Sequence, residues 1–277
     1  MAVKMIALDL DGTTLRSDKS LSPRTAKALS DAIDRNINVV IATGRCLGAL
    51  PAVMRDFPGI QYAITSNGAQ LVDLRKKETV IAHYHRPENV EKIAELLRPL
   101  DPRKDMAEIF VDGQAYLEEE LYRATERGEI GFRTREYVLT TRTPVKGYID
   151  FMLAHKDKVE NINIFFPSAE ERERVQKPFR EMKGVTYPTS WDWNLEVGPA
   201  DTSKANTLME LCNRLGVGKE EIMACGDSPN DIDMMRLAAY PVAVGNAKEQ
   251  VKKEAVFVSD TNENDGVAIA IEKFALV

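Results

Sequence analysis

Two carboxylates follow a short apolar run near the start of the sequence, in the stretch MIALDLDGTTL from Met5 to Leu15. The run predicts a buried strand, and Asp9 and Asp11 stand where this strand should end. Polar clusters of the same kind follow three later apolar runs. Their members are Thr43, Gly44 and Arg45; Ser66, Asn67 and Gly68; and Asp227, Ser228, Asn230 and Asp231. Because ligands of an open α/β sheet bind at the carboxyl ends of its strands, we expect these side chains to meet at one site.

The charge of these clusters indicates what they could bind. Their metal-binding groups are oxygens, which suit Mg²⁺, a hard cation that proteins hold through a few carboxylates together with a phosphate. Asp9, Asp11, Asp227 and Asp231 would carry a charge of −4, which would repel an anionic substrate. One Mg²⁺ and the ammonium of Lys204, in the stretch DTSKAN, would bring this charge to −1. The sequence therefore predicts a divalent cation and a lysine beside a phosphate group.

Each of these residues also has an ordinary structural explanation. Asp231 follows Ser228 by three positions and could complete a capping box, the explanation we favour for Asp231 taken alone. Asn67-Gly68 and Asp11-Gly12 are typical of tight turns. Arg45 fits a solvated helix position as well as it fits a substrate contact. Several unrelated turns would, however, have to imitate one phosphoryl-transfer site, so we prefer the functional interpretation of the whole set.

The elements that must position these residues alternate between strands and helices at both ends of the chain. KMIALDL, INVVIATGR and YAITSNGA are typical of buried strands, and LSPRTAKALSDAIDRN predicts a helix with Ser22 as its N-cap and Pro23 at its first position. After Asp201 the helices TSKANTLMELCNRLG, PNDIDMMRLA and DGVAIAIEKFAL alternate with the strands EIMACGDS, PVAVG and AVFVS. This order predicts an α/β fold with a doubly wound, Rossmann-like parallel sheet.

The middle of the chain interrupts this alternation. PENVEKIAELLRPL and SAEERERVQKPFREM predict helices, the second with a capping box between Ser168 and Glu171. Short strands are predicted around Glu108–Tyr116, Gly147–Leu153 and NINIFFP, and a strand pair in GVTYPTS and WNLEVGP. We therefore predict a discontinuous core of residues 1–84 and 192–277, with an inserted α+β domain at residues 85–191.

Composition limits the classes of function. The 277-residue chain is 44% hydrophobic and has a net charge of −6, which argues against a general binder of nucleic acid or anionic membranes. The apolar run after Lys4 is too short for a signal peptide and is broken by Asp9, and no apolar stretch reaches the ~18 residues of a membrane span. Three scattered cysteines without a C-x-x-C motif are typical of reduced thiols in a cytoplasmic protein. We expect His83, His85 and His155 to be surface or packing residues.

Taken together, the motifs resemble those of the haloacid dehalogenase superfamily. DLDGTTL is similar to its D-x-D-G-T motif, and its other three motifs resemble Thr43 in IATGR, Lys204 in TSKAN, and Asp227, Asn230 and Asp231 in GDSPND, in the same order. TSNGA and VAVGNA are similar to the Cof-type branch, which carries a large α/β cap between the second and third motifs, where the insertion falls here. The resemblance covers essentially the whole chain. Thr14 stands where leucine is common in the family.

The resemblance implies a Mg²⁺-dependent phosphatase that acts on small phosphorylated metabolites such as sugar phosphates. It implies that Asp9 is the nucleophile that forms an aspartyl-phosphate, that Asp11 is the general acid and base, and that Thr43 and Lys204 complete the catalytic set. The implied phosphate-binding residues are Leu10, Thr43, Gly44, Arg45, Asn67, Lys204 and Asn230. The implied metal ligands are Asp9, Asp11 through its backbone carbonyl, Asp227 and Asp231. The inserted domain would act as a lid that sets substrate choice, and the protein would be a monomer or homodimer.

Two other functions stay open. A phosphosugar mutase of the same superfamily would return the phosphoryl group to the substrate, so isomerised sugar phosphate without net phosphate release would favour it. A non-enzymatic, receiver-like phosphoacceptor would also use an aspartate on an α/β sheet with Mg²⁺. Asp11 argues against this second function, because a signalling module benefits from slow hydrolysis and lacks such an acid. A stable phosphoprotein with negligible turnover would favour it.

Overall fold

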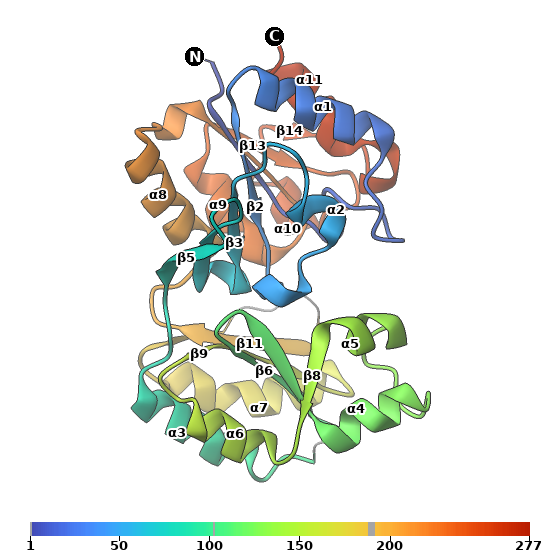
Figure 1. Cartoon of the computed structure of the whole chain (residues 1–277), viewed down its shortest axis with the longest axis vertical. Coiled ribbons are helices and arrows are strands. Elements are labelled where there is room, and N and C mark those ends of the chain that lie inside the picture. The colour runs from blue at the N-terminus through green and yellow to red at the C-terminus, as the bar shows by residue number, and fades with distance from the viewer. Residues whose placement is uncertain (1, 102, 188–191) are drawn as a thin grey trace. The chain divides into compact units, whose positions relative to one another are not determined.

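The computed structural model of the chain describes residues 2–101, 103–187 and 192–277. The chain forms two compact units, each with its own sheet and helices (Figure 1). Unit 1 comprises Met1–Arg45, Leu50–Ile81 and Ser203–Val277, and unit 2 comprises Cys46–Ala49 and Ala82–Thr202.

Unit 1 is built on an eight-stranded sheet of order β14-β13-β12-β1-β2-β3-β4-β5. The strands are β1 (Met5–Leu8), β2 (Asn38–Ala42), β3 (Tyr62–Thr65), β4 (Gln70–Asp73), β5 (Glu78–Ala82), β12 (Ile222–Gly226), β13 (Tyr240–Ala243) and β14 (Phe257–Val258). Strands β14 to β3 pair in parallel, and β4 runs antiparallel to β3. The predicted α/β fold with a parallel-sheet core is therefore confirmed.

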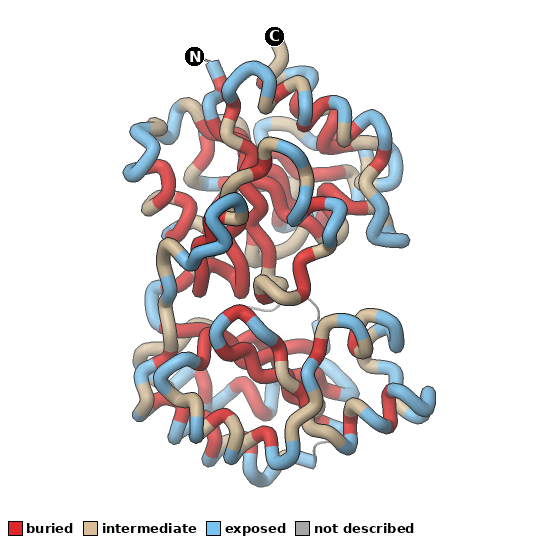
Figure 2. Tube along the Cα trace, in the orientation of Figure 1, coloured by how far each residue is buried: buried red, intermediate tan, exposed pale blue. Residues whose placement is uncertain are grey.

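Helices cover both faces of this sheet. They are α1 (Pro23–Asp34), α2 (Ala52–Arg55), α8 (Lys204–Leu215), α9 (Ile232–Leu237), α10 (Glu249–Lys252) and α11 (Gly266–Phe274). Short 3₁₀ turns are η2 (Ser66–Gly68), η3 (Lys219–Glu221), η4 (Pro229–Asp231) and η5 (Asn262–Asn264). The central strands β1 and β12 are buried along their whole length (Figure 2), as their apolar runs predict. Helix α1 begins as predicted, because the Ser22 side chain accepts a hydrogen bond from the Thr25 N–H and Pro23 follows at once.

The order of the strands brings the predicted motifs to one edge of the sheet. Strands β1, β2 and β3 lie side by side, and the chain later returns to place β12 on the other side of β1. The carboxyl ends of β1 and β12 are thus neighbours where the strand order reverses, which is where open α/β sheets bind ligands. The Asp9 N–H donates to the Cys225 carbonyl at 3.1 Å, so the segment after β1 is held against the end of β12.

Unit 2 contains a six-stranded sheet of order β10-β11-β9-β6-β7-β8. Its strands are β6 (Met106–Val111), β7 (Gln114–Glu118), β8 (Arg142–Val145), β9 (Val159–Phe165), β10 (Val185–Thr186) and β11 (Asn194–Pro199), and its helices are α3 (Pro87–Leu97), α4 (Glu119–Glu126), α5 (Arg135–Thr141), α6 (Tyr148–Ala154) and α7 (Ala169–Glu181). Neighbouring strands are antiparallel except for β7 and β8. One face of the sheet shares a hydrophobic core with α3, α6 and α7.

One predicted strand of this region is wrong. The stretch predicted as the strand Gly147–Leu153 lies mostly in helix α6 (Tyr148–Ala154), and Gly147, directly before the helix, has a left-handed backbone with φ +65°. Tyr148 and Met152, four residues apart, are both buried in the core, which is the spacing of one helix face. The apolar residues of this stretch fit both periods, and packing against the sheet selects the helix.

Two other predictions for this region need refinement. The strand predicted around Glu108–Tyr116 is a hairpin of β6 and β7, whose turn residues Asp112 and Gly113 both have positive φ, as a D-G turn requires. The predicted strand pair at GVTYPTS and WNLEVGP is present as antiparallel β10 and β11. Residues 188–190 of that pair lie outside the described residues.

Part of the segment after β2, Cys46–Ala49, belongs to unit 2. Cys46 and Ala49 pack with Phe110 and Ala115, and the Gly48 N–H donates to the Gly113 carbonyl at 2.8 Å. This loop holds the 3₁₀ turn η1 (Leu47–Ala49). The main insertion runs from Ala82 to Thr202, whereas the sequence analysis gives 85–191, and its predicted last residue, Trp191, lies outside the described residues. That unit 1 is a catalytic core and unit 2 a cap stays a prediction.

The three cysteines, His85 and His155 behave as packing residues. Cys46, Cys212 and Cys225 are buried free thiols, and burial raises the pKa of Cys46 and of Cys225 to about 12. His85 is buried, and its Nε2 donates to the Val197 carbonyl at 3.1 Å. His155 Nδ1 lies 2.8 Å from the Phe151 carbonyl.

The helices are short throughout. The longest in the described residues, α7, has 13 residues. Across residues 2–101, 103–187 and 192–277, none has the length and apolar character required to cross a bilayer.

Candidate active site

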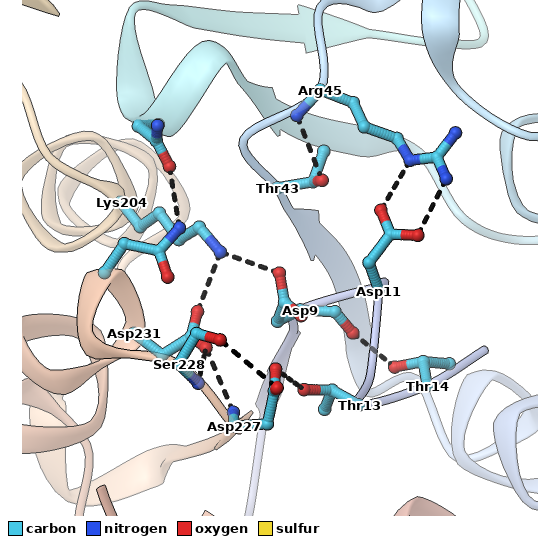
Figure 3. Close-up of polar contacts among 12 residues, drawn as sticks. Asp9, Asp11, Thr13, Thr14, Thr43, Arg45, Lys204, Asp227, Ser228 and Asp231 are labelled. Carbon is cyan, nitrogen blue, oxygen red and sulfur yellow. Dashed lines mark hydrogen bonds and ion pairs between the residues drawn. The ribbon is translucent and has the colours of Figure 1, made fainter. Parts of the chain in front are cut away.

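The ammonium of Lys204 lies between two carboxylates (Figure 3). Its Nζ is 2.7 Å from Asp9 Oδ1 and 2.7 Å from Asp231 Oδ1. Lys204 is the first residue of α8, and the N-cap Ser203 accepts a hydrogen bond from the Asn206 N–H. Burial opposes the positive charge, but Asp231 and Asp9 raise the pKa of Lys204 above its usual value. The lysine is therefore charged, and it is held in place by Asp9 from the start of the chain and by Asp231 from the segment after the insertion.

Asp9 follows the last residue of β1 and is almost fully buried. Burial raises the pKa of Asp9 well above its ordinary value, and the nearby charges of Asp231 and Asp227 act in the same direction, although Lys204 opposes them. The single positive charge of Lys204 is too small to offset the effects of burial and of the two acidic neighbours on Asp9, so this position favours a further cation.

Asp9, Asp227 and Asp231 form a cluster in which one oxygen of each residue lies within 4.8 Å of the others. With Lys204 the formal charge of the cluster is −3 + 1 = −2. Burial, together with the charge of Asp231, raises the pKa of Asp227 to about 6. Three closely spaced carboxylates with a net negative charge fit a hard divalent cation.

Asp231 has two roles at once. Its Oδ2 accepts hydrogen bonds from the N–H groups of Asp227 and Ser228, both at 3.0 Å, which confirms the predicted cap at the start of η4. Its Oδ1 contacts Lys204. The capping and the functional interpretations of this residue are therefore compatible, because each uses a different oxygen of the carboxylate.

The carboxylate of Asp11 lies apart from this cluster. Arg45 binds it with both arms of the guanidinium, Nε to Oδ2 at 2.6 Å and Nη2 to Oδ1 at 2.7 Å, and Lys19 Nζ lies 2.8 Å from Oδ1. Burial acts to raise its pKa, but Arg45 and Lys19 hold the pKa of Asp11 well below its ordinary value. Strand β1 ends at Leu8, and the turn that follows directs Asp9 toward Lys204 and Asp11 toward Arg45 (Figure 3).

Thr43, Gly44 and Arg45 lie in the loop directly after β2. The Thr43 N–H donates to the Ile64 carbonyl at 2.9 Å, and its Oγ1 accepts the Arg45 N–H at 3.2 Å. The Arg45 side chain is 10% exposed and lies in no helix, so the alternative of a solvated helix position is wrong. The contact between Arg45 and Asp11 was not predicted from the sequence.

The tight turn predicted at Asn67-Gly68 is also present. Asn67 has φ +55° and Gly68 has φ +103°. The Asn67 Oδ1 accepts a hydrogen bond from Asn230 Nδ2 at 3.0 Å, which joins the third polar cluster to the fourth.

The family relationship follows from a match along most of the chain. A family model of haloacid dehalogenase-like hydrolases matches residues 6–271. The chain belongs to this family. The match includes all four polar clusters and the whole of the insertion, so the resemblance inferred from the motifs is confirmed.

Relatives of this haloacid dehalogenase-like hydrolase are similar to it over nearly their full length. The chain is 29% identical over 274 residues to the 5-amino-6-(5-phospho-D-ribitylamino)uracil phosphatase YcsE of Bacillus subtilis (strain 168), covering 99% of this chain and 96% of the relative. It is 27% identical to the pyridoxal phosphate phosphatase YbhA of Escherichia coli (strain K12), covering 97% of each. A solved haloacid dehalogenase-like hydrolase from B. subtilis is 26% identical, with a TM-score of 0.83 over 98% of this chain and 99% of the other.

Three side chains for which no role was predicted, those of Thr13, Thr14 and Asn246, hold the site of this hydrolase together. Thr13 Oγ1 donates to Asp227 Oδ1 at 3.0 Å, and Thr14 Oγ1 donates to the Asp9 carbonyl at 2.6 Å. Asn246 Nδ2 donates to the Gly12 carbonyl at 2.7 Å. A signal for the threonines was available, because both directly follow the D-x-D-G stretch.

Backbone geometry explains two further positions in this segment. Gly12 has φ +82°, which L side chains rarely adopt, and a Cβ there would lie 2.8 Å from Asp227 Oδ2, so glycine is favoured between the two acidic segments. The side chain of Leu10 is fully buried, and its carbonyl accepts the N–H groups of Thr14 and Leu15 at 3.1 and 2.9 Å. Leu10 therefore contributes to the turn through its backbone.

Proposed function

We propose that this chain is a Mg²⁺-dependent phosphatase that hydrolyses phosphomonoesters of small metabolites through an aspartyl-phosphate. The observation that carries the proposal is the position of Lys204 between Asp9 and Asp231, with Asp227 beside them, where the strand order of the sheet reverses. The two relatives given above are both phosphatases, which supports the reaction class.

In the first step, an oxygen of Asp9 attacks phosphorus, and the bond between phosphorus and the leaving oxygen breaks. Lys204 neutralises charge on Asp9 and on the transferring phosphoryl group. In the second step, water attacks the phosphorus of the aspartyl-phosphate, which releases inorganic phosphate and restores the Asp9 carboxylate.

Asp11 is the proposed general acid in the first step and general base in the second. Arg45 and Lys19 hold its carboxylate in this structure, so both oxygens accept hydrogen bonds from cations. We propose that these two side chains release Asp11 during turnover, so that it can give a proton to the leaving alkoxide and later take one from the attacking water.

A bound Mg²⁺ would supply positive charge that offsets the charge of the phosphate and the three clustered carboxylates. Asp9, the backbone carbonyl of Asp11 and Asp227 would hold it, with Asp231 supporting the cluster. Thr43, the Gly44 amide, Lys204 and Asn230 are the proposed phosphate contacts. Direct contacts of Leu10, Arg45 and Asn67 with substrate stay predictions from the family resemblance.

We propose that unit 2 chooses the leaving group. The relatives named above are named for different phosphorylated compounds, so the shared fold does not decide the substrate. Unit 2 carries buried polar side chains on β9 and β11, where Asn194 Nδ2 donates to Asn163 Oδ1 at 3.2 Å and to Glu196 Oε1 at 3.0 Å. These amide and carboxylate groups are candidates for recognising hydroxyl or amine groups of a substrate.

The test is a screen of phosphorylated metabolites, with release of inorganic phosphate measured in the presence and absence of Mg²⁺. We expect turnover of one or more phosphomonoesters that is abolished by EDTA. Activity that survives complete metal removal would refute the metal requirement. Isomerised sugar phosphate without phosphate release would show a mutase, and a stable phosphoprotein without turnover would show a phosphoacceptor. Exchange of residues 82–202 for those of a relative should change the substrate profile if unit 2 selects the leaving group.

A further inference from the structure

The turn Ser66–Gly68 contains three consecutive residues with left-handed backbones. Their φ angles are +50° for Ser66, +55° for Asn67 and +103° for Gly68. Glycine adopts this region readily and asparagine does so at modest cost, but serine rarely does. Such a run persists only where the surrounding structure holds it, and strained positions of this kind cluster at functional sites.

The turn binds the loop after β2 through two backbone hydrogen bonds. The Ser66 N–H donates to the Arg45 carbonyl at 2.8 Å, and the Asn67 N–H donates to the Thr43 carbonyl at 3.1 Å. Thr43 and Arg45 bracket the segment that we propose binds phosphate. Both N–H groups therefore hold this turn against the neighbouring loop.

The same turn contacts the start of α8. The Thr207 Oγ1 donates to the Gly68 carbonyl at 2.6 Å. A Cβ on Gly68 would lie 2.2 Å from the Ser203 carbonyl oxygen, so the turn and the N-terminus of the helix are in direct backbone contact. Lys204 is the next residue after Ser203, and its position therefore depends on how closely the helix approaches this turn.

A third contact reaches the fourth polar cluster. The Asn67 side chain is almost fully buried, and its Oδ1 accepts the hydrogen bond from Asn230 Nδ2 at 3.0 Å. The amide nitrogen of Asn230 carries two hydrogens, so this bond uses one of them and orients the plane of the amide. Connecting β3 to β4 requires none of these three contacts, which all lead away from the hairpin.

We infer that the Ser66–Gly68 turn is a positioning device of the active site, in which Asn67 acts through Asn230 and the backbone of the turn sets the spacing between the Thr43 loop and Lys204. This inference rests on the proposed phosphatase function, because Thr43, Lys204 and Asn230 are its phosphate contacts. Asn67 is thus a positioning residue, distinct from the direct phosphate contact that the family resemblance implies. A displacement of about 1 Å in such groups can lower a rate by about 100-fold.

The first test compares Asn67→Gly with Asn36→Gly. Both asparagines have left-handed backbones, with φ +55° and +60°, so glycine is tolerated at each, and Asn36 is exposed on the surface. With p-nitrophenyl phosphate and saturating Mg²⁺, we expect N67G to lower kcat/KM by about 10- to 100-fold and N36G to change it less than about two-fold. A merely structural role would lower the melting temperature of N67G and leave kcat/KM of the folded protein unchanged, and that result would overturn the inference.

The second test is a double-mutant cycle with Asn230→Ala. If Asn67 acts through Asn230, then N67G in the N230A background should change kcat/KM by less than about three-fold. Full multiplication of the two effects would instead show that Asn67 acts independently of Asn230, and would refute the proposed action of Asn67 through Asn230. A wild-type enzyme without phosphatase activity would remove the proposed function and this inference together, whereas an active wild type with an equally active N67G removes the inference alone.

A third comparison tests the contact with α8 and does not depend on Asn67. Gly68→Ala introduces a clash with the Ser203 carbonyl, whereas Gly216→Ala, at the other end of α8, has φ +67° and open space around its Cβ. We expect G68A to lower kcat/KM by about 100-fold or more and G216A to lower it less than about three-fold. Equal activity of the two variants would contradict the proposed link between the turn and Lys204.

Discussion

Each unit of the molecule buries a cluster of charged side chains, and the two clusters are balanced in opposite ways. In unit 1, Lys204 faces the three carboxylates of Asp9, Asp227 and Asp231. In unit 2, the single carboxylate of Glu108 is fully buried between two arginines. Arg142 binds it through Nε and Nη2 at 2.7 and 2.8 Å, and Arg133 Nε lies 3.3 Å away.

The pKa values of the carboxylates are shifted in opposite directions in the two clusters. Burial acts to raise the pKa of Glu108, but Arg133 and Arg142 hold it below its ordinary value. The guanidinium of Arg142 also lies 4.5 Å from the ring centre of Tyr137, and that of Arg133 lies 4.7 Å from the ring centre of Phe165. In unit 1 the pKa values of Asp9 and Asp227 are raised instead. The cluster of unit 2 is satisfied by its own chain, whereas that of unit 1 is short of positive charge, as expected of a site that binds a cation.

The largest expected effect is the loss of activity in Asp9→Asn. The amide cannot serve as the nucleophile, so phosphatase turnover should fall by about 10⁴-fold or more. The melting temperature should rise or stay the same, because the substitution removes one of three neighbouring negative charges. The phosphatase turnover and the melting temperature of D9N, measured beside those of the surface variant Asp31→Asn as a control, test both expectations. Turnover near the wild-type rate would exclude Asp9 as the nucleophile.

The second prediction concerns the balanced cluster and is opposite in kind. Glu108→Gln leaves the buried guanidinium of Arg142 and the partly buried guanidinium of Arg133 without their anion, so the free energy of unfolding should fall by about 3–5 kcal/mol. Urea denaturation measures this change. Glu254→Gln, which breaks an exposed pair with Arg236, is the matched control and should alter stability far less. Unchanged stability of E108Q would show that the buried pair contributes little to unit 2.

The third prediction concerns the pH dependence of unit 2. Burial lowers the pKa of His85 to about 4, below the value near 6.5 of an unfolded histidine. Between these two values the unfolded chain binds a proton that the folded chain does not, so stability should fall as the pH drops from about 6.5 to 4, by about 3 kcal/mol in total.

His85→Gln removes this titration and retains a donor for the Val197 carbonyl. Urea denaturation at pH 7.5, 6, 5 and 4 should therefore show a shallower loss of stability in the variant than in the wild type. Identical slopes for the two proteins would contradict the role of His85.

The smallest predicted effect is stabilisation by the cation itself. At a Mg²⁺ concentration about 100 times its dissociation constant, binding should stabilise the folded protein by about 2.7 kcal/mol. Thermal denaturation with and without Mg²⁺ measures this shift. The shift should be much smaller in Asp227→Asn and should be retained in E108Q, because only the first variant changes the unbalanced cluster. An equal shift in D227N would place the metal elsewhere.

Much of the core could be predicted from the sequence, because its central elements are defined by local patterns. The continuous apolar runs of β1, β2 and β12 leave little alternative to buried strands, and the Ser22-Pro23 pair marks the first turn of α1. The site residues were found for a related reason. Apart from Lys204, which begins α8, they lie in the segments that follow β1, β2, β3 and β12, and parallel strands end at a common edge.

Predictions for unit 2 were less complete because its elements depend on contacts between distant segments. The stretch at residues 147–153 has apolar positions that suit either a strand or a helix, and only the core formed by α3, α6 and the sheet selects the helix. The segment Cys46–Ala49 carries no signal that it belongs to unit 2, because its partners, Phe110 and Ala115, lie more than 60 residues later.

The sequence by itself determined which chemical groups are available, where the strands that carry them end, and that a lysine and four aspartates belong to one site. It could not determine how these charges are divided. Only the tertiary structure pairs Asp9 with Lys204 and pairs Asp11 with Arg45 and Lys19, although a single residue separates the two aspartates in the sequence. The physical reason is that the energy of a charge depends on its burial and on its distance from other charges. Both are set by the turn after β1 and by the order of strands that are far apart in the sequence.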